Sequence, residues 1–391
     1  MSWVTCNIGD ALQLIQNGIN CKQSKDTIGD KISRIETISD ANVNFSKVGF
    51  AVLSENEKVK AQLHKNDILF SHINSPIHVG KTAHFNGEEP LFHGINLLRL
   101  RVNENIDSRF FNYFLNRLFW SGHWKRTAKQ SVNQASVNQT DIKGVSFSYP
   151  PIPEQQRIVA ILDQAFADIE KARANAEQNL KNILELYLSN KQEIFGRSIL
   201  ESQMINLTSV CENIFAGGDA PKKGLYSKIE TDNYKIPIYA NAVKDAGLYG
   251  FTDYFRVDKP SITIAARGSG TGHIELRRDS FLPIVRLIVL IPLTETLSLE
   301  YFKHALQNLD ILRSGSAIPQ LTVPMIKEYS IPVPSLDSQL SIVDEIESLG
   351  GYIEECKKLY EQKLASLDEL KKSLLQKAFS GELTKGEGRA A

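Results

Sequence analysis

One segment of the chain is repeated, and the repeat constrains the fold more than any other feature. Residues 142–195 and 326–379 align without a gap at an offset of 184, and 17 of the 54 aligned positions are identical. Each copy is a proline-containing segment followed by a long helical pattern, and each follows a long non-helical stretch. The order is therefore globule, helix, globule, helix. Two related helices on one chain can pack about a pseudo-twofold axis, which predicts an internal dimer with two similar but non-identical globules.

Both copies carry an apolar stripe at helical spacing. The stripe residues recur in steps of three and four, as on the buried face of a long helix. Adding 184 to the first stripe gives the second, and these matching steps favour mutual packing of the two helices. A helical hairpin inside a core or a homo-oligomeric coiled coil would show the same pattern. The predicted packing residues are Ile158, Leu162, Ala165, Ile169, Ala172, Ala176, Leu180 and Ile183 on the first helix, and Ile342, Ile346, Leu349, Ile353, Cys356, Tyr360, Leu364 and Leu367 on the second.

The stretches before the helices read as two α+β globules. Each has short β-like runs followed by a helix-like stretch, near residues 110–119 and 299–312. Gly350 and Gly351 interrupt the second helical pattern, and glycine inside a helix costs about 1 kcal/mol relative to alanine. We therefore expect a bend or a close helix approach there. The predicted segments are a first globule at 1–150, a first helix at 151–198, a second globule at 199–335, a second helix at 336–383 and a tail at 384–391.

Composition excludes several classes of protein. The 45 basic and 45 acidic side chains cancel, which argues against a protein that coats nucleic acid with its whole surface. The sequence has no apolar run of about eighteen residues and no signal pattern, so we expect a cytoplasmic protein. The four cysteines lack metal or redox spacing. Five of the eight histidines lie between His64 and His93, but without a pattern of carboxylates or thiolates that would hold a metal, so no metal site is predicted.

Two segments resemble motifs of enzymes. Residues 75–82 nearly match a phosphate-binding P-loop, but Ser75 replaces the first glycine and the following residues do not begin a helix. We favour a turn in which Lys81 contacts a phosphate over an ATP site. Tyr149-Pro150-Pro151 resembles the Pro-Pro of aminomethyltransferase motifs, but the Asn or Asp that would hold the target amine is missing. No catalytic residue is predicted.

The repeated segments carry a resemblance to a known family. Residues 150–159, Pro-Pro-Ile-Pro-Glu-Gln-Gln-Arg-Ile-Val, and their weaker echo at 332–343 resemble the specificity subunit of type I restriction-modification enzymes. Residues 67–71, 315–321 and 377–383 support this resemblance, which spans essentially the whole chain. It implies two target recognition domains, each reading one half of a split DNA site, held apart by an antiparallel coiled coil of the two helices.

The resemblance also implies partners and a division of labour. Two methyltransferase subunits would dock on this chain, together with restriction subunits in the full complex. In such a family this subunit performs no chemistry and holds no cofactor, and the partners use S-adenosylmethionine, ATP and magnesium. The second copy has Ser338, Leu340 and Ser341 where the first has Glu154, Gln156 and Arg157, so contacts made by those side chains need not be symmetric.

We therefore predict a non-catalytic subunit that reads a bipartite, asymmetric DNA site and scaffolds its partners. The alternatives are a coiled-coil scaffold and a DNA-binding module outside restriction-modification. Between Arg99 and Lys129, basic residues alternate with aromatic ones, which fits either a DNA-binding surface or an amphipathic helix. The glycines at 268–272 allow close approach to DNA, although a plain surface turn fits equally. The candidate DNA-binding residues are Lys22, Lys25, His78, Lys81, Lys125, Arg126, Lys222, Lys223, Arg267, Ser269, Thr271 and His273.

Overall fold

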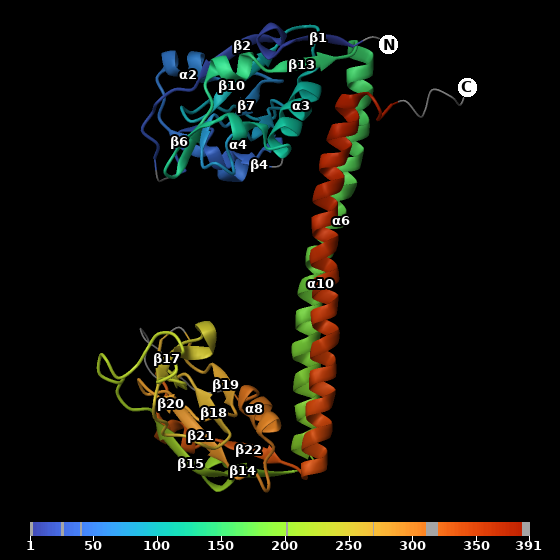
Figure 1. The fold of residues 1–391 in the computed structure, drawn as a ribbon. Coiled ribbons are helices and arrows are strands. Elements are labelled where there is room, and N and C mark those ends of the chain that lie inside the picture. The colour runs from blue at the N-terminus through green and yellow to red at the C-terminus, as the bar shows by residue number, and fades with distance from the viewer. Residues whose placement is uncertain are drawn as a thin grey trace, which may run out of the picture. The chain divides into compact units, whose positions relative to one another are not determined.

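The protein consists of two β-rich domains and two long helices. The computed structural model describes residues 3–24, 27–39, 41–200, 202–268, 270–309 and 320–384. The chain divides into a first compact unit, residues 1–177 with 361–391, and a second, residues 178–360. Each unit thus contains one globule and a part of each long helix. These helices are α6 (Ile152–Leu200) and α10 (Leu336–Ser380) (Figure 1).

The first globule is built around a six-stranded sheet in the order β2-β10-β7-β9-β5-β4. The helix α3 lies on the side of this globule that faces α6 and α10 (Figure 1). The elements are β1 (Val4–Asn7), α1 (Ile8–Ala11), β2 (Leu12–Asn17), β3 (Asp30–Ile32), η1 (Ile35–Thr37), β4 (Ile38–Ser39), β5 (Ala41–Val43), η2 (Phe45–Lys47), β6 (Gly49–Ala51), α2 (Glu55–Ala61), β7 (Ile68–Phe70), β8 (Ile73–Asn74), β9 (Thr82–His84), β10 (Leu98–Val102), α3 (Ser108–Trp120), α4 (His123–Thr127), β11 (Lys129–Ser131), β12 (Gln134–Ser136), α5 (Gln139–Lys143) and β13 (Ser146–Tyr149).

The second globule repeats the central part of this sheet. Its four strands have the order β15-β21-β18-β19, which matches β2-β10-β7-β9 of the first globule. The elements are β14 (Gln203–Asn206), α7 (Leu207–Val210), β15 (Cys211–Ala216), β16 (Ile236–Tyr239), η3 (Lys244–Gly247), β17 (Leu248–Thr252), β18 (Ser261–Ile264), β19 (Ile274–Arg277), β20 (Leu282–Pro283), β21 (Ile288–Pro292), α8 (Leu299–Gln307), α9 (Val323–Lys327) and β22 (Ser330–Val333).

A glycine follows the first strand of each central sheet for the same reason. A Cβ atom on Gly18, after β2, would lie 2.1 Å from the Gly94 carbonyl oxygen. A Cβ atom on Gly217, after β15, would lie 2.7 Å from the backbone of Pro283. Both positions therefore require glycine because another backbone segment passes too closely for any side chain. Common topology and this shared constraint show that the two globules are built alike.

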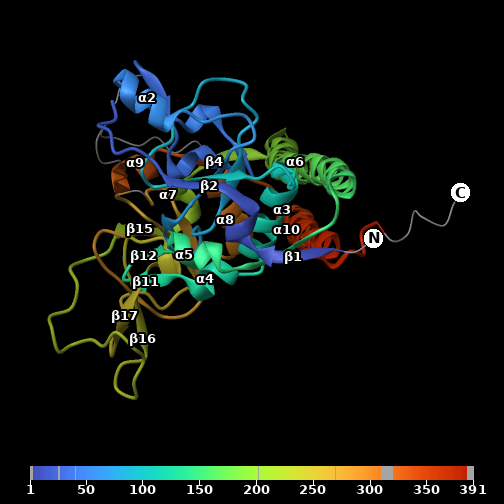
Figure 2. The ribbon, with the colours of Figure 1, turned by 90° about the horizontal axis from the view of Figure 1, so that it is seen from above.

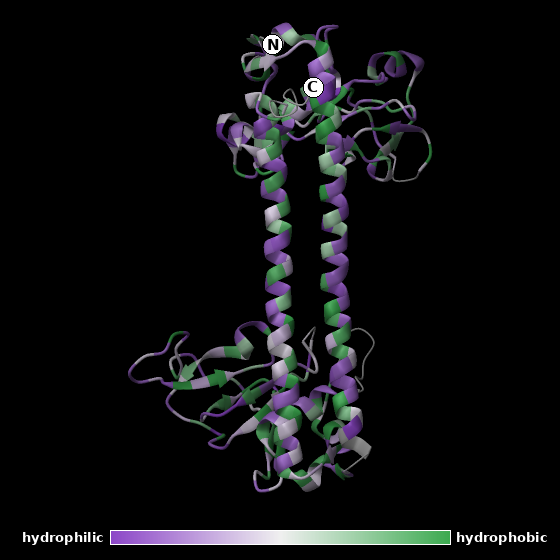
Figure 3. Ribbon diagram, turned by 90° about the vertical axis from the view of Figure 1, so that its right-hand side faces the viewer, coloured by the Kyte–Doolittle hydropathy of each residue, from purple (hydrophilic) through white to green (hydrophobic). Residues whose placement is uncertain are grey.

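The two long helices bury their apolar stripes. All sixteen stripe positions from Ile158 to Ile183 and from Ile342 to Leu367 are buried or half-buried. Hydrophobic and hydrophilic residues alternate along both helices (Figure 3), and the two helices lie side by side when they are viewed nearly end-on (Figure 2).

Within each unit, the residue pairs show that the helices are antiparallel. In the first unit Lys371 bonds to Glu170 at 3.0 Å, and Asp368, earlier on α10, pairs with Arg173, later on α6. In the second unit Asn179 bonds to Tyr360 at 3.1 Å, and Arg197 bonds to Glu345 at 2.7 Å. As the residue number rises on one helix, it falls on the other by nearly the same amount.

Of the bend or close helix approach expected at Gly350 and Gly351, the close helix approach is wrong. The helix α10 runs unbroken through both residues, and an added Cβ atom on either would meet nothing within 4 Å. The adjacent Tyr352 is 68% exposed, whereas Ile346 and Ile353 lie on the packed side. The glycines therefore lie toward the outer side of the helix, where they permit no closer packing.

The hydrophobic core of each globule continues into both long helices. In the first unit it includes Ile158 and Leu162 of α6 with Leu375 and Ala378 of α10. In the second unit it includes residues 194–195 of α6 with Val343 and Ile346 of α10. Each globule therefore packs on the start of one helix and the end of the other.

A buried glutamine joins the first globule to the start of α6. Gln155 is fully buried. Its Oε1 accepts a hydrogen bond from the backbone N–H of Asp107, the residue that caps α3, at 2.8 Å. Its Nε2 donates to the carbonyl oxygens of Asn105, at 3.0 Å, and Pro150, at 2.8 Å. One side chain thus bonds to the α3 cap, the loop before it and the segment that leads into α6.

The repeated glutamine makes the same three contacts in the second unit. The Oε1 of Gln339 accepts from the backbone N–H of Ser298, which caps α8, at 2.8 Å. Its Nε2 donates to the carbonyl oxygens of Thr296 and Pro334, both at 2.9 Å. Gln339 is also fully buried. Sequence identity at this pair of positions therefore reflects an identical attachment of each globule to a helix start.

The repeated phenylalanines make the corresponding contact at the helix ends. The ring of Phe379, near the end of α10, lies 4.8 Å from the ring of Phe110 on α3. The ring of Phe195, near the end of α6, lies 5.8 Å from the ring of Tyr301 on α8. The helices α3 and α8 therefore make corresponding contacts with the helix pair in the two units.

Candidate nucleic-acid interface

The two hairpin loops predicted to contact DNA occupy equivalent places in the two sheets. The loop between β7 and β9, residues 71–81, contains His78 and Lys81. The loop between β18 and β19, residues 265–273, contains Arg267, Thr271 and His273. Since β7 and β9 correspond to β18 and β19 in the common strand order, the two loops join corresponding strands at the same end of the two sheets.

In the first unit, a close contact brings two groups of predicted residues together. Gly80 has a φ of +87°, and a Cβ atom there would lie 2.1 Å from Cδ1 of Trp124. Trp124 is buried on α4, and the next two residues are Lys125 and Arg126, both exposed. The loop that carries Lys81 is therefore packed against the helix that carries the other two cations.

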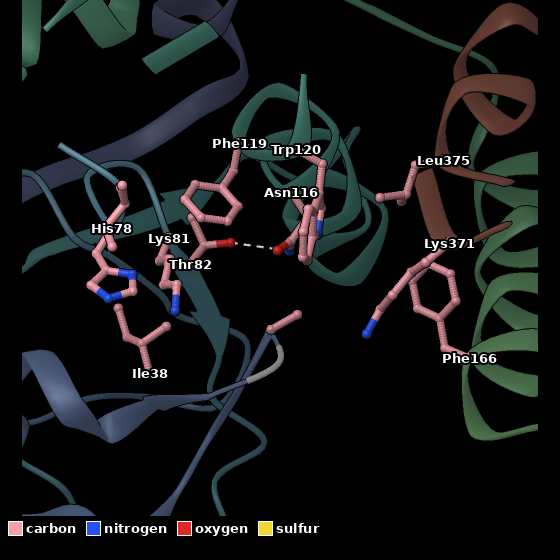
Figure 4. A pocket seen from close by; sticks show the side chains of 12 residues that line it. Ile38, His78, Lys81, Thr82, Asn116, Phe119, Trp120, Phe166, Lys371 and Leu375 are labelled. Carbon is pink, nitrogen blue, oxygen red and sulfur yellow. Dashed lines mark hydrogen bonds between the residues drawn. The ribbon is translucent and has the colours of Figure 1, made fainter. Parts of the chain in front are cut away.

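The first hairpin loop borders a pocket of about 280 Å³. Its walls come from the loop, from α3 and from both long helices within the unit, and they include Lys81, Phe119, Trp120 and Lys371 (Figure 4). The Lys81 ammonium lies 6.0 Å from the centre of the Phe119 ring. Burial, and then the Lys81 charge, lower the pKa of His78. The neutral form of His78 is therefore favoured, so Lys81 rather than His78 supplies the charge of this loop.

Most of the basic and aromatic residues between 99 and 129 have internal roles. Arg99 is buried and donates to the Gln62 carbonyl oxygen at 2.6 Å. Arg101 bonds to Asp67 at 2.7 Å, and Arg109 bonds to Asp163 at 2.7 Å. Four aromatic residues of α3 lie in the core, Phe110, Phe111, Tyr113 and Phe114, whereas Trp120 is 37% exposed. The amphipathic-helix interpretation therefore holds for most of this segment. Arg109 is exposed but paired with Asp163, and Lys125, Arg126 and Lys129 are exposed in its last part.

Two of the crowded histidines of the first globule, His84 and His93, have structural contacts. His84 bonds to the Ser108 hydroxyl at 2.9 Å, and the Nε2 of His93 lies 3.0 Å from the Leu97 carbonyl oxygen. Burial lowers the pKa of each to about 4, so both are neutral at pH 7. Among the described residues, no group of three His, Cys, Asp or Glu side chains converges as metal ligands would. The P-loop resemblance also ends at Thr82, which begins strand β9 instead of a helix.

In the second unit, the predicted residues of the hairpin loop have different surroundings. Arg267 is exposed. Thr271 is buried, and its hydroxyl donates to the Gly268 carbonyl oxygen at 2.7 Å. The Nε2 of His273 lies 2.8 Å from a carboxylate oxygen of Glu275. Arg267 is thus the residue of this group that is available to a ligand, whereas Thr271 shapes the loop.

The remaining predicted residues are not brought together with these groups by any contact in the described part of the chain. Lys22 is exposed near β3 and β6, and Lys222 and Lys223 are exposed in the segment after β15. Lys25 and Ser269 lie outside the described residues.

Sequence reasoning missed one turn beside the second hairpin loop. The turn between β16 and β17, residues 240–247, places Lys244 and Asp245 at the surface. A Cβ atom on Gly270 of the hairpin loop would lie 2.4 Å from Cγ2 of Val243 in this turn. The Asp-Ala-Gly sequence at 245–247 is typical of a tight turn and could have identified it.

In the parts of the chain that the structure describes, no helix is long and apolar enough to cross a membrane.

Comparison with family models gives one match, in two parts. The model described as the type I restriction modification DNA specificity domain matches residues 2–178 and again residues 200–363. The two matched parts each begin near the start of a globule and extend into the following helix. The match therefore covers most of the chain and repeats with the internal duplication.

Curated relatives and solved structures agree with this match. The chain is 28% identical to a putative type I restriction enzyme specificity subunit, MjaX, of Methanocaldococcus jannaschii, over 97% of this chain and 93% of that protein. It is 23% identical to the EcoBI specificity subunit of Escherichia coli, over 78% and 73%. Among structures, a chain from a study of complex assembly and conformational transition of the type I R-M system has a TM-score of 0.78 at 16% identity, covering 97% of this chain and 98% of that chain. The HsdS subunit of Thermoanaerobacter tengcongensis has a TM-score of 0.63 at 16% identity, covering 97% of both chains.

Proposed function

The chain belongs to the family of type I restriction-modification DNA specificity subunits, and from this membership we propose how its two units divide the recognition of DNA. It is the DNA specificity subunit of a type I system and is itself non-catalytic. The subunits of this family carry no cofactor, and their partners bind S-adenosylmethionine and ATP. In our proposal each globule reads one half of a bipartite, asymmetric site, and the two helices set the gap between the halves.

The attachment of the globules supports this proposal. Gln155 and Gln339 hold the two globules to helix starts by the same three bonds, and the sheets share one strand order. The surfaces differ, because Lys81 lies in one hairpin loop and Arg267 in the other. A common attachment with different loops would let two globules that recognise different DNA sequences be held in the same way on the helices.

The length of the helices supports the role of a spacer. The helix α6 has 49 residues, which is about 74 Å at about 1.5 Å per residue. Two turns of B-DNA span roughly 68 Å, so readers attached near the two ends of such a helix could reach grooves on either side of an unread spacer.

Two methyltransferase subunits are the proposed partners, with restriction subunits in the full complex. The internal duplication supports this stoichiometry, because it offers two quasi-equivalent docking surfaces. Native mass spectrometry of the co-expressed complex should show two methyltransferase copies per chain. A strict one-to-one complex at saturating partner would contradict the proposal.

Domain exchange tests the division of recognition. Residues 1–150 are replaced by the equivalent segment of another specificity subunit, and the methylated motif is read by methylome sequencing. We expect one half of the motif to change and the other to stay, because base contacts are local to a domain. A change in both halves would refute independent reading, and a complex without any sequence-selective methylation would favour a scaffold.

A further inference from the structure

The two globules diverge in one strand connection. In the first globule β3 pairs with β6, and in the second β16 pairs with β17. The two pairs occupy equivalent places, because Phe50 of β6 forms an antiparallel bridge with Ser24 and Phe251 of β17 forms one with Ser227. The connection from β3 to β6 contains η1, β4, β5 and η2. In the first globule β5 pairs with β9 and extends the sheet beyond the four strands that the two globules share. The connection from β16 to β17 is only the short 240–247 turn. Two related globules that recognise different DNA sequences must differ in the segments that contact the bases.

The 240–247 turn has an unusual backbone. Asp245 has φ 51° and ψ 36°, Ala246 has φ 51° and ψ 30°, and Gly247 has φ 79°. Left-handed conformations are unfavourable for residues with a Cβ atom, and two such residues in succession persist only when the surrounding structure holds them. Strain of this kind is concentrated at functional sites.

A nearly buried arginine holds the turn in this conformation. Arg277 on β19 is 7% exposed, and its Nη2 donates to the Ala246 carbonyl oxygen at 2.5 Å. Its Nε donates to the Thr263 hydroxyl at 3.2 Å, and its guanidinium lies 3.5 Å from the centre of the Tyr239 ring. Removing a guanidinium from water is costly, so its bond to the carbonyl of a surface turn indicates that the shape of the turn matters.

The turn and the second hairpin loop form one surface. The Oδ1 of Asn241 accepts from the Ala266 N–H, and its Nδ2 donates to the Arg267 carbonyl oxygen at 3.3 Å. Val243 packs against Gly270 of the same loop. Lys244 and Asp245 are exposed in this turn. A Lys ammonium can donate to guanine, and a carboxylate can accept from cytosine N4.

We propose that the 240–247 turn is a specificity-determining element of the second globule, that Lys244 and Asp245 read bases in its half-site, and that Arg277 is a positioning residue for them. This inference rests on the proposed division of the DNA site between the globules. The side chains of Lys244 and Asp245 contact base edges, and Arg277 acts only through the backbone of the turn.

The test uses the full chain assembled with its methyltransferase subunits and a duplex library randomised over the methylated motif. Lys244→Ala and Asp245→Ala are each expected to lower discrimination roughly tenfold at one base-pair position of the second half-site and to leave the first unchanged. Lys235→Ala is the matched control, since Lys235 is also exposed and lies at the opposite end of β16. Unchanged base preference in both turn variants, or a loss of affinity that is uniform over all sequences, would overturn base reading by the turn.

Arg277→Lys tests the positioning role. It keeps the charge but cannot bond to Thr263 and Ala246 in the guanidinium geometry, so it should relax the same positions as the turn variants. Adding Ala246→Gly should restore discrimination, because glycine adopts the left-handed conformation without the steric cost. A purely structural role in the sheet would not be rescued by a change in the turn, and failure of this rescue would remove Arg277 from the proposal.

The wild-type complex separates this inference from the function on which it rests. If the wild-type complex selects no bipartite motif, the proposed function fails. If it selects one and the turn variants retain every base preference, the function stands and the inference about the turn fails.

Discussion

At the scale of single residues, the duplicated glutamines show why the two repeats share an identical residue at this position. Gln155 and Gln339 were visible in the sequence as an identical pair, but nothing in the sequence placed them in a fully buried site. Each side chain forms hydrogen bonds with the backbone N–H of a helix N-cap residue and with two backbone carbonyl oxygens. These backbone groups lie outside the helices and strands. Such groups are costly to leave unbonded when they are buried.

Gln155→Ala should therefore destabilise the protein by roughly 3 kcal/mol, because it leaves buried backbone groups without partners and creates a cavity. Chemical denaturation of the variant and the wild type measures the difference in the free energy of unfolding. Gln156→Ala is the matched control, since the neighbouring Gln156 is exposed and its loss should cost less than about 0.5 kcal/mol. Equal stability of the two variants would contradict the role of Gln155.

At the scale of elements, the two hairpin loops offer a direct comparison. Gly80 and Gly268 lie in equivalent loops and both have a φ of +87°. At Gly80 a Cβ atom would collide with Trp124, whereas at Gly268 it would meet nothing within 4 Å. The two glycines thus have the same backbone conformation and differ in their surroundings.

Gly80→Ala should destabilise the protein by more than about 2 kcal/mol and displace the loop that carries Lys81, because it adds a steric clash to the left-handed strain. Gly268→Ala should cost only about 1 kcal/mol, from the strain alone. Thermal or chemical unfolding of the two variants gives the comparison. A cost at Gly268 equal to or above that at Gly80 would mean that the packing of Trp124 does not hold the first loop.

The elements also show what could be predicted from the sequence and what could not. Periodicity is local, so the stripes on α6 and α10 were readable from residues such as Ile158 and Ile346. The burial of Thr271 and the internal ion pair of Arg101 depend on contacts between distant segments, and composition alone gives no sign of them. Gly350 was misread because its position on the outer side of the helix follows from helix packing and not from its propensity.

At the scale of the whole molecule, the duplicated segment gives both units the same arrangement of globule and helices. Each unit contains one globule attached to the start of one helix and the end of the other, through the repeated Gln155 and Gln339 and the repeated Phe195 and Phe379. The antiparallel pairing within each unit follows from this arrangement. If the helices are the spacer, a change in their length must change the gap between the half-sites and nothing else.

The most direct test of this claim lengthens both helices together. Four residues are inserted after Ala176 and four after Tyr360, which nearly preserves the apolar stripes because four residues are close to one helical turn. The insertion adds about 6 Å along the helix axis. Methylome sequencing should then find the same two half-sites with a spacer longer by about one or two base pairs. An active complex that keeps the original spacer would show that the helices do not set the distance.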